Sequence, residues 1–164
     1  INKFSNNVMA RNLLLSLVAQ RGGEPATTTA AVVRVAEWMA AAGLDASTVV
    51  LQNGSGLSRE ERISAAALAA LLQRAWRQPT MPEFLSALPI AGIDGTMAKR
   101  FENSPLKGRA HIKTGSLDDV ASIAGYVTAK SGKRMAVVCI INHPKANDAR
   151  AAFDSLLTWL YENY

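Results

Sequence analysis

Two short clusters of polar residues in this sequence carry side chains that can bind a substrate or move a proton. Near the start, Ser5-Asn6-Asn7 places a hydroxyl and two amides in front of an apolar stretch, and much later Lys113-Thr114-Gly115-Ser116 combines an ammonium group, two hydroxyls and a glycine. On a strand, Lys113 and Gly115 share one face. The lysine can then hold an anionic group while the glycine lets a substrate backbone approach, and backbone N–H groups just beyond can serve an oxyanion.

Each cluster also has a plain structural interpretation. Serine and asparagine before an apolar run are typical of a helix cap. The lysine cluster is equally typical of a solvent-facing strand end followed by a turn glycine. A three-residue match is weak when it stands alone, so both interpretations of each cluster stay open at this point.

The elements that must position these clusters follow from hydrophobic periodicity and turn residues. We expect residues 1–105 to be mainly helical and residues 106–164 to hold sheet strands and a C-terminal helix. This order predicts an α/β (α+β) fold with an antiparallel sheet covered by that helix. The expected helices span Val8–Val18, Thr27–Gly43, a segment around Leu68–Ala75 and Asp148–Tyr161, and the expected strands span Ala110–Thr114, Ser122–Thr128 and Arg134–Ile141.

Local signals predict where several of these helices begin and end. Asn6 or Asn7 is placed to cap the first helix, and Gly22-Gly23 is expected to end it. The run Ser58-Arg59-Glu60-Glu61 fits a capping box. Pro79 and Pro82 are expected to interrupt the chain beyond the third helix.

Composition and charge exclude several classes of function. The formal net charge is +5 over 164 residues, but the basic residues are scattered and no aromatic residues interleave with them, so nucleic-acid binding is not expected. No apolar run approaches the roughly 20 residues of a membrane span. The single Cys139 cannot form an internal disulfide, and neither His111 nor His143 has a partner at metal-ligand spacing. We therefore expect no metal and no cofactor.

Taken together, the two clusters resemble a known pair. Ser5-x-Asn7 and Lys113-Thr114-Gly115 are similar, in the right order, to two of the three motifs of penicillin-recognising serine enzymes. The chain resembles the C-terminal part of the transpeptidase-like domain of D-alanyl-D-alanine carboxypeptidases of the low-molecular-mass (class C) penicillin-binding proteins, which also act as endopeptidases. Further landmarks of that family lie in order along the chain, at Asn53-Gly-Ser-Gly-Leu-Ser-Arg59, Leu88-Pro-Ile-Ala-Gly-Ile-Asp-Gly95 and Gly125-Tyr126.

The resemblance implies a role for each matching residue. Ser5 would relay a proton between the catalytic lysine or nucleophile and the leaving amine, and Asn7 would bind the substrate's amide carbonyl and orient the catalytic lysine. Lys113 would supply positive potential for the substrate's terminal carboxylate. The hydroxyls of Thr114 and Ser116 would donate hydrogen bonds, Gly115 would admit the substrate, and the N–H of Ser116 would form half of the oxyanion hole.

One departure from the family pattern matters for activity. The family's nucleophile lies in a Ser-x-x-Lys motif upstream of the serine–asparagine pair. The sequence has one such match, Ser104-Pro-Leu-Lys107, which comes too late and is followed at once by Gly108. We interpret Ser104 as a loop residue. Because the chain begins at Ile1 without a visible signal peptide, we expect a processed product or a cut piece whose nucleophile lies in a missing N-terminal part, and we expect it to be inactive alone.

The resemblance also implies partners and a location. A peptidoglycan peptide ending in D-Ala-D-Ala would be the substrate, β-lactam antibiotics would trap the enzyme, and the missing N-terminal part of the same protein would complete the site. The location would be periplasmic, with no transmembrane segment in this chain. Three alternatives stay open: a noncatalytic peptidoglycan- or partner-binding module of the same fold, a β-lactamase, and an unrelated basic α+β domain with chance motifs.

Overall fold

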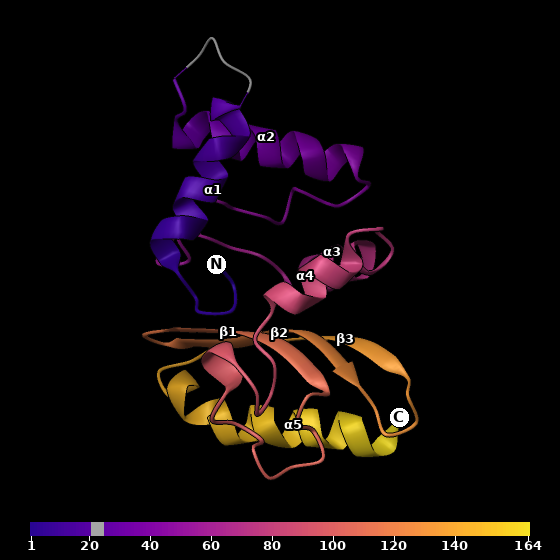
Figure 1. The fold of residues 1–164 in the computed structure, drawn as a ribbon. Coiled ribbons are helices and arrows are strands. Elements are labelled where there is room, and N and C mark those ends of the chain that lie inside the picture. The colour runs from indigo at the N-terminus through magenta and orange to yellow at the C-terminus, as the bar shows by residue number, and fades with distance from the viewer. Residues whose placement is uncertain (21–24) are drawn as a thin grey trace. The chain divides into compact units, whose positions relative to one another are not determined.

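The computed structural model of the chain describes residues 1–20 and 25–164, which form two compact units. The first unit holds Ile1 and residues 6–70, and the second holds residues 2–5 and 71–164. Figure 1 labels the helices and strands of both. The helix end predicted at Gly22-Gly23 lies outside the described residues.

Two capped helices build the core of the first unit. In α1 (Asn7–Ala19) the cap is Asn6, whose side chain accepts a hydrogen bond from the N–H of Met9 at 2.9 Å. In α2 (Thr28–Ala41) the side chain of Thr27 accepts one from the N–H of Ala30. The helices pack through a small apolar cluster of buried residues, Leu14, Val18 and Ala31.

The capping box predicted at Ser58–Glu61 is wrong. None of these residues is helical. The next helix, α3, spans Ala65–Trp76, and the Ser64 hydroxyl accepts a hydrogen bond from the N–H of Ala67 at 3.0 Å. Glu61 is instead used by the glycine-rich loop, where its carboxylate accepts hydrogen bonds from the N–H groups of residues 52–54. With its carboxylate bonded to these three donors, Glu61 does not pair with the N–H of Ser58 as a capping box requires.

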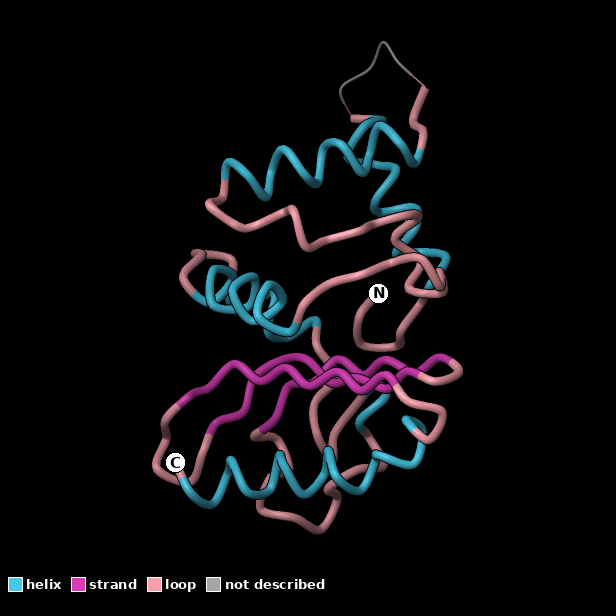
Figure 2. The backbone as a smooth tube through the Cα atoms, turned by 180° about the vertical axis from the view of Figure 1, so that it is seen from behind, coloured by secondary structure: helices cyan, strands magenta, loops and turns pink. Residues whose placement is uncertain are grey.

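The second unit is built around an antiparallel sheet in the order β1-β2-β3, whose strands form one layer in Figure 2. The strands are β1 (Ala110–Leu117), β2 (Val120–Thr128) and β3 (Arg134–Asn142). They confirm the predicted antiparallel α+β fold, and β1 extends beyond its predicted end. Its extension carries Gly115 and Ser116 within the strand, where Gly115 pairs with Ser122 of β2.

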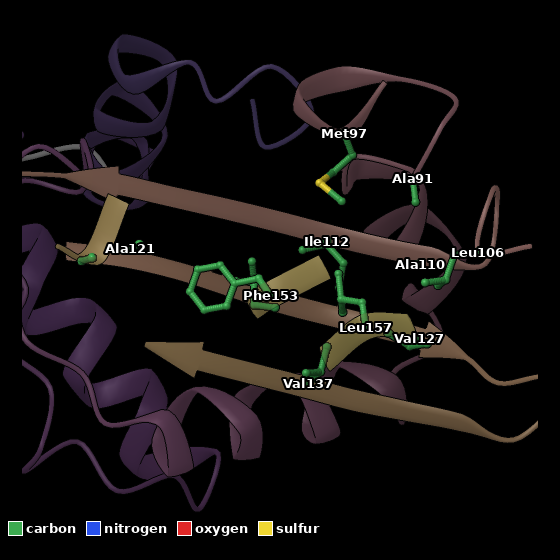
Figure 3. Close-up of a cluster of buried hydrophobic side chains, with 12 residues drawn as sticks. Ala91, Met97, Leu106, Ala110, Ile112, Ala121, Val127, Val137, Phe153 and Leu157 are labelled. Atoms are coloured by element: carbon green, nitrogen blue, oxygen red, sulfur yellow. The ribbon is translucent and has the colours of Figure 1, made fainter. Parts of the chain in front are cut away.

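Helices cover both faces of this sheet. On one face, α5 (Arg150–Asn163), introduced by the short 3₁₀ helix η2 (Ala146–Ala149), inserts Phe153 and Leu157 against Ile112, Val127 and Val137 (Figure 3). The other face packs against α4 (Met81–Ala87) and the end of α3, through a second cluster that joins Leu72, Met81, Leu88 and Tyr126.

Helix α4 was not predicted from the sequence. Pro82 stands in its first turn. Backbone N–H groups in the first turn have no partner within the helix, so the missing N–H of proline costs nothing there, and its fixed φ suits the helix. The proline that was expected to interrupt the chain therefore begins an element. No helix in the described part of the chain has both the length and the hydropathy to cross a membrane.

Gly125 allows β1 and β2 to pair closely, and its replacement should break that pairing. A Cβ at this position would collide with the backbone carbonyl of His111 on β1. We predict that Gly125→Ala lowers the free energy of unfolding by about 3 kcal/mol or more, measured by urea denaturation. Gly132→Ala is the control, because nothing lies within 4 Å of that position and only its φ of 88° opposes a side chain. Equal losses of about 1 kcal/mol in both variants would contradict the assignment.

Candidate active site

The structure brings Ser5 and Lys113 into contact across 108 positions of sequence. The ammonium group of Lys113 donates hydrogen bonds to the hydroxyl oxygen of Ser5 at 2.8 Å and to the carbonyl oxygen of Thr114 at 2.5 Å. Lys113 stands on β1, opposite Ala124 of β2, on the sheet face away from α5. One residue of each cluster that the sequence singled out, Ser5 and Lys113, thus lies in contact within the second unit.

Burial makes this ammonium group less stable than an ordinary one. Desolvation of the half-buried side chain lowers the pKa of Lys113 from its usual value of 10.5. No ion pair of the described residues joins Lys113 to a carboxylate. A cation that is partly desolvated and lacks a counter-ion favours the arrival of an anion.

The loop that carries Ser5 is held against the rest of the second unit by two contacts of Lys3. Lys3 forms an ion pair with Asp94, and its carbonyl oxygen accepts a hydrogen bond from the N–H of Thr96 at 3.1 Å. Gly95 lets that carbonyl approach, since a Cβ at Gly95 would collide with it. Ser5 itself has a φ of 52°, a left-handed conformation that costs about 1 kcal/mol or more for a non-glycine residue. The surrounding contacts stabilise Ser5 in this conformation.

The outer edge of β1 is paired along its first half and open beyond it. The N–H of Ile112 donates to the carbonyl of Pro89 at 2.8 Å, and the N–H of Ala91 donates to the carbonyl of Ala110 at 2.9 Å. Backbone groups on one edge of a strand recur at every second residue, so those of Thr114 and Ser116 point to this edge as well. No turn, loop or side-chain hydrogen bond of the described residues uses the N–H of Ser116. That stretch of edge can accept the backbone of an extended peptide.

The hydroxyls of Thr114 and Ser116 face the α5 side of the sheet, beside a cavity of about 330 Å³. The Thr114 hydroxyl lies 3.3 Å from that of Thr96, and the Ser116 hydroxyl donates to the side-chain oxygen of Asn147 at 2.7 Å. Arg150 also lines this cavity and has no ion pair among the described residues. The cavity therefore offers polar groups and a positive charge next to the open edge of β1.

The same cavity contains a second guanidinium that is already neutralised. Arg100 is buried and forms an ion pair with Asp154 of α5. Its Nε donates to that carboxylate at 3.0 Å, and a further nitrogen contacts the sulfur of Met97. Removing Asp154 would leave a buried charge uncompensated, so this pair is a structural support for the cavity wall.

Asn7 and Gly115 each have one close side-chain or backbone neighbour that bears on their role. Asn7 begins α1 in the first unit, where its side-chain nitrogen donates to the carbonyl of Ser55 at 2.5 Å, so the glycine-rich loop orients it. Gly115 faces Ser122, whose hydroxyl oxygen would lie 2.5 Å from a Cβ at position 115. A side chain at position 115 would push against Ser122 of β2 and occupy space beside β1.

Other residues weighed from the sequence do not join the site. Ser104 lies in a turn, where its hydroxyl accepts a hydrogen bond from the N–H of Leu106 at 3.2 Å, so no helix carries Lys107 as the family's nucleophile motif requires. His111 shares the face of Lys113, but its Nδ1 lies 3.1 Å from the carbonyl oxygen of Leu85. His143 lies in the loop after β3, where its Nδ1 accepts from the N–H of Lys145.

Sequence reasoning missed the residues that support the site. Asp94, Thr96, Asn147 and Arg150 were assigned no part in it. Asp94 belongs to the Leu88–Gly95 landmark, and its place between Gly92 and Gly95 was the signal that could have marked it. Nothing in the sequence pairs Thr96 with Thr114 or Asn147 with Ser116, because those contacts depend on how the loops return to the sheet.

Comparisons with known proteins show which family the chain belongs to. A model described as the D-Ala-D-Ala carboxypeptidase 3 (S13) family matches residues 1–162. The chain is 34% identical over 136 residues to a D-alanyl-D-alanine carboxypeptidase of Actinomadura sp. (strain R39), covering 80% of this chain and 25% of the relative. It is 34% identical over 159 residues to carboxypeptidase DacB of Mycolicibacterium smegmatis, covering 93% of this chain and 34% of the relative.

A solved structure gives the same result for the fold. Penicillin binding protein 4 of Haemophilus influenzae, complexed with a novel β-lactam, superimposes with a TM-score of 0.83 and 26% identity. The match covers 98% of this chain and 40% of that chain. The chain thus spans between a quarter and two fifths of the length of these three relatives.

The ion pair of Lys3 with Asp94 should make the stability of the chain depend on pH. Partial burial raises the pKa of Asp94, but hydrogen bonds from Lys3 and Ile90 outweigh it and hold the pKa below its usual value of 3.8. A depressed pKa stabilises the folded state above pH 3.8, and this contribution is lost as the pH falls through the folded-state pKa. We predict that Asp94→Asn lowers the free energy of unfolding by about 1 kcal/mol at pH 7 and by less at pH 3.

Urea denaturation between pH 3 and pH 7 measures this difference. Glu102→Gln is the matched control, because Glu102 is an exposed carboxylate and its loss should change stability little at any pH. Amide hydrogen exchange at Ser5 should be faster in the Asp94 variant than in the control. A difference between wild type and Asp94→Asn that grows toward acid pH would contradict the assignment.

Proposed function

Because the chain belongs to the D-Ala-D-Ala carboxypeptidase 3 (S13) family, we propose that it forms one wall of the active site of a serine D-alanyl-D-alanine carboxypeptidase/endopeptidase acting on peptidoglycan peptides. The contact of Lys113 with Ser5 beside an open strand edge is the observation that carries the proposal. This pair places a cation and a hydroxyl where an extended peptide can lie.

The substrate would bind as an additional strand along the outer edge of β1. Its main chain would pair with the edge beyond Ile112, where residues 89–91 no longer cover it. Its terminal carboxylate would lie in the positive potential of Lys113 and accept hydrogen bonds from the hydroxyls of Thr114 and Ser116. The guanidinium of Arg150 in the adjoining cavity adds to this potential.

The reaction would proceed through an acyl-enzyme. A serine outside these 164 residues would attack the carbonyl carbon of the penultimate D-alanine, and the N–H of Ser116 would stabilise the oxyanion. Loss of one such donor typically costs about 3 to 4 kcal/mol of transition-state stabilisation. The C–N bond would then break, and water would hydrolyse the acyl-enzyme in a second step.

Ser5 and Asn7 would act on protons and orientation. The Ser5 hydroxyl accepts a hydrogen bond from Lys113, which leaves its own proton free to be donated toward the leaving amine. The leaving nitrogen would take the proton of the Ser5 hydroxyl, and Ser5 would take a proton back from the general base. Asn7, held by the carbonyl of Ser55, would bind the substrate's amide carbonyl and orient the catalytic lysine.

The proposal extends to inhibitors and location. β-Lactams would acylate the same serine, and the solved relative from Haemophilus influenzae is itself a complex with a β-lactam. Because peptidoglycan lies outside the cytoplasmic membrane, the complete protein would work in the periplasm.

A noncatalytic peptidoglycan-binding module is the second candidate. It is favoured by one observation: the only Ser-x-x-Lys of the 164 residues is the turn at Ser104–Lys107. Such a module would keep the open edge of β1 and the cation of Lys113 but would form no acyl-enzyme. Covalent labelling by penicillin therefore separates the two candidates.

Labelling with a fluorescent penicillin tests the proposal. We predict that the 164-residue chain alone is not labelled, whereas a longer protein that contains it together with a Ser-x-x-Lys segment is labelled. In that longer protein Lys113→Ala should lower the second-order acylation rate constant by about 100-fold, the equivalent of about 3 kcal/mol. Lys99→Ala, which removes an exposed lysine, should leave the rate unchanged. Stable labelling of the isolated chain, or no labelling of the longer protein, would overturn the proposal.

A further inference from the structure

A second concave region lies on the sheet face that carries Lys113, toward the start of β1 and of β3. It consists of two adjoining cavities of about 380 and 280 Å³. Both are lined by the same three side chains, Trp76, Tyr126 and Arg134. We call this region the arginine groove, and define it by Trp76, Tyr126, Arg77, Arg109 and Arg134.

Three arginines line the groove. Arg77 lines the larger cavity, Arg109 lines the smaller one, and Arg134 lines both. No aspartate or glutamate lines either cavity, and no ion pair of the described residues involves these three arginines. Like charges without counter-ions repel one another, so the groove favours binding of an anion.

The wall between the two cavities is partly aromatic. The guanidinium of Arg134 stacks 5.3 Å from the ring centre of Trp76, and the rings of Trp76 and Tyr126 lie 5.3 Å apart. The Tyr126 hydroxyl donates to the carbonyl of Leu72 at 2.6 Å, and burial raises its pKa to about 12. Tyr126 therefore adds no negative charge to the groove at neutral pH.

The groove is separate from the candidate active site. It shares no residue with the cavity beside Thr114 and Ser116. Arg109 precedes Lys113 by four residues, which is about 13 Å along an extended strand. Leu85 of α4 lines the smaller cavity, and its carbonyl contacts His111 between these two positions.

We propose that the arginine groove binds carboxylates of a second peptide of the same cell-wall polymer whose D-Ala-D-Ala terminus occupies the active site. This inference rests on the proposed function for the identity of the polymer. A guanidinium pairs with a carboxylate through two parallel hydrogen bonds. One arginine in each cavity and a third between them suit a ligand with two carboxylates, while Trp76 offers an apolar face to a sugar ring or a methyl group. The groove would keep a polymeric substrate attached between cleavage events.

Titration of the 164-residue chain tests the groove directly. The probe is a disaccharide–pentapeptide fragment of peptidoglycan, followed by ¹H–¹⁵N NMR with the indole N–H of Trp76 as reporter. We expect saturable shifts at Trp76, and binding at least ten-fold weaker in Arg109→Gln/Arg134→Gln. Arg34→Gln, which removes an arginine paired with Glu37 on α2, is the control and should bind as wild type. Backbone spectra that match wild type establish that each variant is folded.

Two further arms identify the ligand. A fragment whose carboxylates are amidated should not shift Trp76, and tripolyphosphate should bind more weakly than the carboxylated fragment. Equal binding by the double variant and the control, or equal or tighter binding of tripolyphosphate, would overturn the proposal. If the fragment does not bind the groove but the longer protein is labelled by penicillin, only the proposal for the groove is rejected. If the fragment binds the groove but the longer protein is not labelled, only the proposed enzyme activity is rejected.

Discussion

The structure depends on how the ammonium group of Lys113 is satisfied. A lysine that loses part of its hydration on the sheet face must find hydrogen-bond acceptors, and it finds the hydroxyl of Ser5 and the carbonyl of Thr114. The first acceptor requires the loop 2–5 to reach the sheet. The ion pair of Lys3 with Asp94, 91 positions apart in sequence, and the close approach at Gly95 hold that loop in place.

The sheet supplies the rigidity that such a site needs. Helix α5 packs Phe153 and Leu157 against one face, and Gly125 allows close pairing of β1 with β2. β1 is therefore paired with β2 along its whole inner edge, and with residues 89–91 along the first half of its outer edge. The outer edge of its last residues stays open. An edge strand left open is a liability unless something is meant to pair with it, and a peptide substrate has the backbone groups to do so.

The sequence allowed the elements and the two motifs to be predicted, but not the contacts that join them. Apolar periodicity located α5 and the three strands, because burial on one face repeats at a fixed spacing. Helix α4 was missed because Pro82 was interpreted as an interruption. Ser58 matched a capping pattern, yet Glu61 was needed by the loop before it. Asp94 lies in a loop beside the sheet and Arg150 begins α5, and their places near the site are set by tertiary packing rather than by local spacing.

One measurement tests the role of Lys113 most directly: the pKa of its ammonium group, followed by NMR of the side-chain Cε and Nζ with and without N-acetyl-D-Ala-D-Ala. Burial should hold the pKa of the free chain below the usual 10.5. A bound carboxylate should raise it, and the C-terminal amide of the same dipeptide should not. A pKa at the ordinary value that neither compound changes would contradict the assignment of Lys113 as the carboxylate-binding cation.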